Sequence, residues 1–251
     1  MPSADALCVA LDGSDRVWIS ATARRLAGCV GWLKIGLEAF IAFGPELVRE
    51  VAATGPRVFL DVKLHDIPAT VRRASANAAA CGVDLFTVHA AGGRAMLEAA
   101  VAGAREGTSS VPPKIVAVTL LTSIDREVLR ELGVALTSID REVLRELGVA
   151  SSPEELVPRW AELARDSGLD GVVSSPLEAA RIRRECGPEF LIVTPGIRPA
   201  GSATDDQRRV LTPRQAIVAG ADILVVGRPI TRAPDPAEAA REILMEIESA
   251  N

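Results

Sequence analysis

Eight short apolar segments, each followed by an amphipathic stretch, set the strongest limit on how this chain can fold. Segments that are apolar almost without interruption are typical of parallel strands buried on both faces. Eight of them alternating with helices in 251 residues predict a single-domain α/β fold, the (β/α)8 or TIM barrel. A doubly wound open sheet is the alternative, because a strand count does not prove closure. The segments are 6–12, 32–40, 57–64, 85–90, 114–122, 171–175, 190–197 and 223–230.

A fifteen-residue segment, LTSIDREVLRELGVA, occurs twice in tandem, at 121–135 and at 136–150. One extra copy cannot build the stacked array of a repeat protein. In the first copy Ile124, Val128 and Leu132 form an apolar stripe with helical spacing, and a glycine follows it. We therefore expect an additional short helix inserted after the fifth strand. In a barrel this connection lies on the C-terminal face, where active sites are built.

Composition and charge exclude several classes of function. The net charge of −5 argues against a nucleic-acid partner, which would need a basic surface. No apolar run approaches the roughly 20 residues of a membrane span, and the N-terminus lacks the pattern of a signal peptide. We therefore expect a cytoplasmic protein that does not bind membranes. Reduced thiols rather than a metal site are predicted for the four scattered cysteines, Cys8, Cys29, Cys81 and Cys186.

Lysine is scarce: of 28 basic residues only Lys34, Lys63 and Lys114 are lysines. In LDVKLHDIPAT (60–70), Asp61 and Lys63 are two positions apart on a predicted strand, so both side chains point to the same side. A lone pair of this kind is most often a structural ion pair.

The neighbouring strand changes this interpretation, because WLKIG places Lys34 beside the pair. With Asp66 after the strand, two ammonium groups and two carboxylates would form an alternating array. Such an array keeps a lysine protonated next to a substrate, which makes it a proton donor for a carbanion.

Two C-terminal segments predict a phosphate site and a lid. Gly227 and Arg228 follow the eighth predicted strand, and barrels often bind phosphate at the loops after strands seven and eight. Glycine permits a close approach of the backbone and arginine offers two parallel donors, although such a dipeptide alone is more often structural. The polar segment 197–209, after the seventh strand, is predicted to be a lid over the site.

These motifs together resemble the orotidine 5′-phosphate decarboxylase family. The resemblance rests on LDVKLHDIPAT, on ALD at the first strand, on TPGIRP at the seventh and on VVGRPIT at the eighth, and it runs from residue 6 to 232. It implies a homodimeric barrel that uses neither metal nor cofactor. The implied reaction converts orotidine 5′-phosphate to UMP and CO2, the last step of de novo pyrimidine nucleotide synthesis.

The resemblance also implies roles for individual residues. Lys63 is expected to protonate C6 of the pyrimidine as CO2 leaves, with Asp61 against the substrate carboxylate. Lys34 is expected to contact the ribose and orient Asp61. Asp12 matches a ligand of the ribose hydroxyls, although Asp12 beside a glycine also fits a helix N-cap.

Further contacts follow from the same resemblance. Asp66, Ile67 and Thr70 are expected to reach the partner subunit's site, where Asp66 completes the charge array. The remaining expected substrate contacts are Thr122, Pro195, Arg198, Gln207, Gly227 and Arg228.

Three positions qualify these expectations. Thr122 continues directly from the fifth strand whereas Thr137 does not, so the pyrimidine contact is assigned to Thr122. Asp205 departs from the glycine that the family commonly has before its Asp-Gln pair, and adds negative charge near the phosphate. His89 is interpreted as a supporting residue of the core rather than a catalytic base.

Three alternatives stay open at the level of sequence. One is a Mg2+-dependent sugar-phosphate decarboxylase or aldolase of the same superfamily, although its members typically have an acid at the position of Lys34. A second is an aldolase that forms a Schiff base on Lys63. The third is a catalytically impaired phosphate-binding barrel, in which the duplicated segment disturbs the loop geometry.

Overall fold

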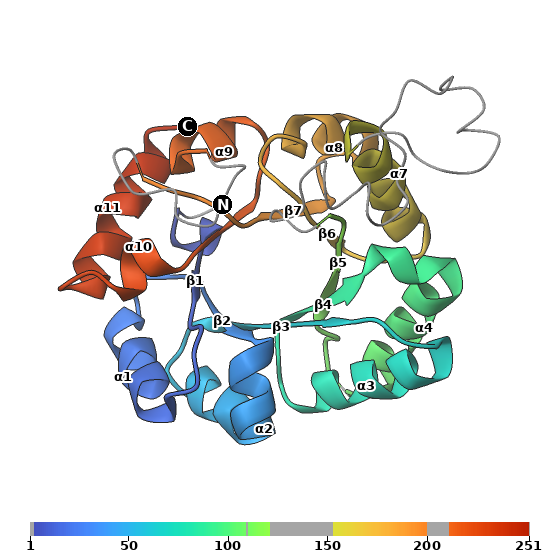
Figure 1. Cartoon of the computed structure of the whole chain (residues 1–251), viewed down its shortest axis with the longest axis horizontal. Coiled ribbons are helices and arrows are strands. Elements are labelled where there is room, and N and C mark those ends of the chain that lie inside the picture. The colour runs from blue at the N-terminus through green and yellow to red at the C-terminus, as the bar shows by residue number, and fades with distance from the viewer. Residues whose placement is uncertain (1–2, 109, 121–152, 200–210, 251) are drawn as a thin grey trace, which may run out of the picture.

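The computed structural model describes residues 3–108, 110–120, 153–199 and 211–250. Its eight parallel strands form a closed barrel in sequence order, in which β8 pairs with β1 (Figure 1). This closure confirms the (β/α)8 barrel and excludes the open doubly wound sheet. The strands are β1 (Leu7–Ala10), β2 (Trp32–Gly36), β3 (Arg57–Leu64), β4 (Leu85–His89), β5 (Lys114–Val118), β6 (Gly171–Val173), β7 (Leu191–Thr194) and β8 (Ile223–Val226).

Helices surround the barrel on its outer side (Figure 1). The principal ones are α1 (Arg16–Leu26), α2 (Leu37–Ala52), α3 (Pro68–Ala80), α4 (Gly93–Glu106), α7 (Pro153–Asp166), α8 (Ala179–Cys186), α9 (Pro213–Val218) and α11 (Pro236–Glu248). Shorter elements are the 3-10 helices η1 (Ser3–Ala6) and η2 (Ala90–Gly92) and the one-turn α10 (Arg228–Thr231). No helix among the described residues is both long and apolar enough to cross a membrane.

The core has two layers, because successive side chains of a strand point to opposite faces. One layer fills the barrel interior and includes Cys8, Trp32, Phe59, Leu85 and Val116. The other lies between the strands and the helices. Apolar side chains therefore fill the barrel interior. Polar groups at the C-terminal ends of the strands lie directly above these side chains.

The predicted strands are all present, but some end earlier than predicted. The prediction that the second strand runs to residue 40 was wrong, because β2 ends at Gly36 and α2 begins at Leu37. Gly36 is the N-cap of this helix and has an extended backbone, so the chain changes direction without a loop. β8 likewise ends at Val226, and α10 begins two residues later with a proline in its first turn.

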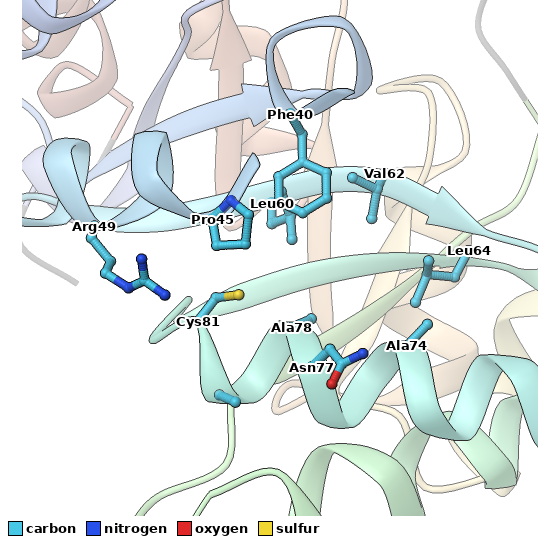
Figure 2. Close-up of a pocket in the computed structure, with 11 residues that line it drawn as sticks. Phe40, Pro45, Arg49, Leu60, Val62, Leu64, Ala74, Asn77, Ala78 and Cys81 are labelled. Atoms are coloured by element: carbon cyan, nitrogen blue, oxygen red, sulfur yellow. The ribbon is translucent and has the colours of Figure 1, made fainter. Parts of the chain in front are cut away.

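A groove of about 490 Å3 lies outside the barrel, between α2 and α3. Figure 2 shows its floor, formed by the outward side chains Leu60, Val62 and Leu64 of β3. Phe40 of α2 and Ala78 of α3 are among the residues of its walls. The groove is thus separated by the strand itself from the inward-facing groups described below.

Candidate active site

The C-terminal mouth of the barrel brings together the charged residues that were predicted from three strands. Lys34 of β2 and Asp61 of β3 occupy inward positions, directly above the apolar interior. Asp12 lies two residues beyond the end of β1, which pairs with β2. The barrel topology therefore assembles a site from segments up to 51 residues apart.

Four side chains form an alternating row of charges. The Lys34 ammonium donates a hydrogen bond to Oδ1 of Asp12 at 2.9 Å and lies 3.4 Å from Oδ2 of Asp61. The Lys63 ammonium donates to Oδ1 of Asp61 at 2.8 Å. The side chains in the middle of the row, Lys34 and Asp61, are only 10% and 15% exposed, whereas Asp12 is 64% exposed. The row, Asp12–Lys34–Asp61–Lys63, therefore runs from solvent into the barrel mouth and presents the Lys63 ammonium there.

The row stabilises the charged forms of its buried members. Burial alone would lower the pKa of Lys34, but the carboxylates of Asp61 and Asp12 outweigh it and raise this pKa above the ordinary value. Burial would raise the pKa of Asp61. Lys34 and Lys63, with hydrogen bonds from Lys63 and Thr87, outweigh it and hold this pKa below its ordinary value. Both groups are therefore ionised at neutral pH.

Lys63 has an unusual backbone conformation. Its φ of 51° places it in the left-handed region, which no other non-glycine residue among those described occupies. This conformation costs a residue with a Cβ atom about 1–2 kcal/mol. Strain of this kind tends to persist where function requires a particular side chain. Glycine would remove the strain here, but it would also remove the ammonium group.

The strand irregularity around Lys63 explains this conformation. Leu60 pairs with Phe86 and Leu64 with Val88, so β3 advances four residues while β4 advances two. Within this bulge the Lys63 N–H donates to Oγ1 of Thr87 at 2.8 Å. The bulge changes the direction of the Lys63 side chain relative to a regular strand.

Sequence reasoning missed two residues of this site. Thr87 contacts both Lys63 and Asp61, yet in LFTVHA it reads as an ordinary strand residue. Gly36 is the other: a Cβ atom there would lie 3.0 Å from Oδ1 of Asp12 and 3.4 Å from Nζ of Lys34. The signals available in the sequence were a polar residue at an inward strand position and a glycine two residues after a buried lysine.

Asp12 has a different role from the helix N-cap considered as its alternative. The N-cap of α1 is Asp15, whose side chain accepts a hydrogen bond from the Trp18 N–H. Asp12 instead pairs with Lys34.

The segment predicted to reach a partner subunit lies at the same end of the barrel but outside the row. Asp66 is exposed, and its Oδ1 accepts a hydrogen bond from the Ile67 N–H at 2.6 Å. Ile67 is the N-cap of α3 and Thr70 lies in the first turn. Within one chain the second carboxylate of the row is therefore Asp12, which pairs with Lys34, whereas the Asp66 carboxylate accepts a hydrogen bond from the N-cap of α3.

The residues predicted to bind phosphate follow β7 and β8. Gly227 and Arg228 directly follow β8, and a Cβ atom on Gly227 would lie 3.7 Å from that of Ala10 on β1. These residues are therefore close to the Asp12 end of the row. Pro195 follows β7, and Arg198 is buried, with Nη1 donating to the Ile197 carbonyl at 3.0 Å.

Several predicted features lie outside the described residues. These are Thr122, Thr137, both copies of the repeated segment, and Asp205 and Gln207 within the predicted lid.

The two histidines of the chain stack on each other beside Lys63. The rings of His65 and His89 have centroids 5.2 Å apart and an angle of 25° between their planes. Burial lowers the pKa of His89, and the nearby His65 and Lys63 lower it further. His89 is therefore neutral at neutral pH, and its contacts agree with the supporting role expected for it.

The acidic side chains of the row are separated by lysines. Among the described residues no group of three or more His, Cys, Asp or Glu side chains is placed to hold a metal ion. What the row offers chemically is a protonated lysine fixed against a carboxylate in a partly dehydrated mouth, an arrangement suited to stabilising negative charge that develops on carbon.

Comparison with known protein families shows to which family the chain belongs. The profile of the "Orotidine 5′-phosphate decarboxylase / HUMPS family" matches residues 5–243. The chain belongs to this family. A family member from Moorella thermoacetica, named orotidine 5′-phosphate decarboxylase, is 53% identical over 252 residues, covering 99% of this chain and 94% of the relative. One of the same name from Syntrophotalea carbinolica is 48% identical, covering 98% of this chain and 94% of the relative.

A solved structure agrees with this membership in the orotidine 5′-phosphate decarboxylase / HUMPS family. The orotidine 5′-phosphate decarboxylase from Lactobacillus acidophilus superposes with a TM-score of 0.76 at 36% identity, covering 96% of this chain and 98% of the other. The matches to this structure and to both relatives extend over nearly the full length of each protein, so they concern the whole barrel rather than one motif.

Proposed function

We propose that this chain decarboxylates orotidine 5′-phosphate to UMP and CO2, the last step of de novo pyrimidine nucleotide synthesis, without a metal or an organic cofactor. Full-length similarity to relatives that bear the name of this enzyme supports the reaction. The structural observation that carries the proposal is the alternating row Asp12–Lys34–Asp61–Lys63 at the barrel mouth.

The row supplies what this chemistry requires. Loss of CO2 breaks the C6–carboxylate bond and leaves its electron pair on C6 of the pyrimidine. The Lys63 ammonium stabilises this charge and donates a proton to C6. Solvent then reprotonates the lysine. Asp61 accepts a hydrogen bond from the Lys63 ammonium at 2.8 Å and so holds it in position before the reaction.

Asp61 contributes a second effect in this proposal. Its carboxylate faces that of the substrate, and the two like charges disfavour the bound ground state. The repulsion disappears as neutral CO2 departs, so the transition state is stabilised relative to the bound substrate. The lysines on both sides keep Asp61 ionised, which this effect requires.

The remaining proposed contacts orient the nucleotide. Lys34 and Asp12 bind the ribose hydroxyls at the outer part of the row. Gly227 and Arg228 bind the phosphate after β8, the strand beside β1. Further contacts with the pyrimidine and phosphate are proposed for Thr122, Pro195, Arg198 and Gln207.

A homodimer is part of the proposal, with Asp66, Ile67 and Thr70 entering the partner subunit's site. Exposed apolar side chains support an interface here: Leu37 is 54%, Ile41 77% and Ile67 66% exposed. Leu37 and Ile67 follow the adjacent strands β2 and β3, and the apolar groove of Figure 2 lies between the helices that they begin. In this proposal a second copy covers this surface, and Asp66 of each subunit reaches the site of its partner. The free thiols of all four cysteines agree with a reducing, cytoplasmic location.

The structure makes two of the alternative functions less favourable. The Lys34 ammonium lies between Asp12 and Asp61, where a magnesium site would need these carboxylates to share a cation. A Schiff base needs a lysine amine that is free to attack a carbonyl, whereas Lys63 donates a hydrogen bond to Asp61 at 2.8 Å. The third alternative is a phosphate-binding barrel whose catalysis is impaired by the repeated segment. It is tested by deleting residues 136–150.

The reaction is tested by following the loss of substrate absorbance with purified protein in EDTA. We expect turnover that is unchanged by the chelator or by added Mg2+. Activity that requires Mg2+ would contradict metal independence, and no turnover under either condition would contradict the function itself.

The shared site is tested by mixing two inactive variants, Lys63→Ala and Asp66→Ala. A heterodimer has one site free of both substitutions if Asp66 acts in the partner's site, so mixing restores activity. If Asp66 acts within its own chain, neither site is restored and the mixture stays inactive.

A further inference from the structure

Thr87 connects the two members of the Asp61–Lys63 pair through one hydroxyl group. Its Oγ1 accepts a hydrogen bond from the Lys63 N–H at 2.8 Å and donates to Oδ1 of Asp61 at 3.1 Å. A threonine hydroxyl has one proton to donate and lone pairs to accept, so both bonds can exist together. Thr87 is completely buried, and water therefore cannot replace either bond.

The hydroxyl takes the place of a backbone partner that the strand bulge removes. In a regular ladder the Lys63 N–H would bond to a carbonyl of a neighbouring strand. Here β3 and β4 are out of register between Leu60 and Leu64, and the N–H bonds to the Thr87 side chain instead. A buried N–H without a partner would be costly, so the hydroxyl favours the left-handed conformation of Lys63 over alternatives that lose this bond.

We propose that Thr87 is a positioning residue for decarboxylation, whose hydroxyl fixes the backbone of Lys63 and the carboxylate of Asp61 in their reactive arrangement. This inference rests on the proposed function. Thr87 acts through these two residues rather than on the substrate. Oδ1 of Asp61 accepts hydrogen bonds from both Thr87 and Lys63. By fixing this oxygen atom, the Thr87 hydroxyl also fixes the position of the Lys63 ammonium that bonds to it.

A purely structural threonine is the competing explanation, and Thr119 provides the matched control. Thr119 is a buried threonine just beyond the end of the next strand, β5, and its Oγ1 donates to the Val173 carbonyl at 2.9 Å. It has a comparable burial and hydrogen bond without contact with the row of charges. Thr119→Val therefore measures the cost of removing a buried hydroxyl in this part of the barrel.

The test compares Thr87→Val, Thr87→Ser and Thr119→Val with the wild-type enzyme. Valine keeps the shape of threonine without the hydroxyl, and serine keeps the hydroxyl. For Thr87→Val we expect kcat to fall roughly 10- to 100-fold with KM changed no more than about twofold, because small misplacements of reacting groups have effects of this size. Thr87→Ser should recover most of kcat, and Thr119→Val should resemble the wild type.

The pH profile separates positioning from a loss of stability. Without the Thr87 donor the Asp61 carboxylate ionises less readily, so the acidic limb of kcat/KM should move to higher pH in Thr87→Val but not in Thr119→Val. The titratable groups around Asp61 that could also contribute are Cys8, Asp12, Lys34, Lys63, His65 and His89. All of them are unchanged in the four proteins, so a shift specific to Thr87→Val is assigned to the lost hydroxyl.

Three kinetic results would overturn the inference: Thr87→Val with wild-type kcat, an equal loss of kcat in Thr119→Val, or no recovery in a folded Thr87→Ser. Circular dichroism checks folding, and Thr87→Ala replaces valine if the latter does not fold. Wild-type turnover is measured first, because its absence contradicts the proposed function. A crystal structure of Thr87→Val gives a readout independent of activity. A shifted Lys63 backbone supports the positioning role. An unchanged φ of Lys63 together with an unchanged Lys63–Asp61 hydrogen bond contradicts it.

Discussion

The Lys34 ammonium lies 3.4 Å from Oδ2 of Asp61, and both side chains are almost completely enclosed by the barrel mouth. This contact joins two shorter pairs, Asp12–Lys34 and Asp61–Lys63, into one row of alternating charge. Buried charges are costly unless each has partners. The stability and the reactivity of this site are therefore linked through the same two residues.

Asp61→Asn tests this link through stability. Loss of this carboxylate removes the Asp61–Lys63 ion pair and, among the described residues, leaves Lys34 paired with Asp12 alone. We therefore expect the free energy of unfolding to fall by about 3 kcal/mol at neutral pH. The folded-state pKa of Asp61 is lowered. Its contribution is therefore fully present above the unfolded value of about 4 and is lost as the pH falls through the folded pKa. Urea unfolding at several pH values should show that the free energies of unfolding of Asp61→Asn and the wild type converge in acid.

Glu46→Gln, an exposed change on α2, is the control for this measurement. Equal stability of Asp61→Asn and the wild type at neutral pH would contradict the expectation.

Lys63→Ala removes the proposed proton donor. We expect kcat to fall by at least about 10³-fold, since the group provides both acid catalysis and electrostatic stabilisation. The protein should remain a folded dimer that binds UMP, as measured by sedimentation and by calorimetric titration. Joint loss of nucleotide binding and of the dimer would instead identify Lys63 as a structural residue.

Lys63→Gly separates the strain at this position from its chemistry. Alanine keeps the unfavourable left-handed conformation, whereas glycine adopts it freely. Relief of the strain should stabilise the folded glycine variant by about 1 kcal/mol relative to the alanine variant. The greater entropy of glycine in the unfolded chain reduces this difference in the free energy of unfolding. Both should be inactive. Thermal unfolding of the pair measures this difference, and an alanine variant more stable than the glycine variant by about 1 kcal/mol, the ordinary preference in regular structure, would show that the strain is absent.

The barrel and three members of the row, Lys34, Asp61 and Lys63, could be predicted from the pattern of the strands. Eight apolar segments indicate the strands, and the two-residue spacing of Asp61 and Lys63 places them on one side. The barrel register is not local. It brings Asp12, rather than Asp66, next to Lys34, and no spacing along the chain indicates this.

The contacts of Lys63 with its neighbours could also not be predicted from the sequence. A threonine in an apolar strand is ordinary, since its branched side chain suits strands. Only the bulge opposite Thr87 makes its hydroxyl a partner for Lys63. Bulges depend on how two strands pair, so the sequence of one strand does not define them.

Gly36→Ala tests the tight packing around Lys34. The added methyl group would lie 3.0 Å from Oδ1 of Asp12, so this carboxylate must shift by a few tenths of an ångström, whereas the distance of 3.4 Å to Nζ of Lys34 is an ordinary contact. Because the backbone conformation of Gly36 suits any residue, we expect little change in the unfolding midpoint. We expect kcat/KM to fall roughly 10-fold as the ion pair shifts. Wild-type kinetics in a stable Gly36→Ala protein would mean that the site adapts to the methyl group at no cost.

A further prediction concerns the repeated segment, which follows β5 in the sequence. Deleting 136–150 leaves one complete copy directly after the predicted fifth strand in the sequence, and the free-energy cost of a longer connection grows only slowly with its length. We therefore expect the deletion protein to retain activity, and an inactive one would show that the fifteen extra residues belong to the site.

Because the two copies are identical, removing either gives the same protein. Point variants of the full chain are therefore needed to distinguish the two threonines. Thr122→Ala should raise KM roughly 10-fold, the effect of one lost hydrogen bond, whereas Thr137→Ala should leave steady-state kinetics unchanged. The reverse pattern would assign the pyrimidine contact to the second copy and make the first copy the insertion.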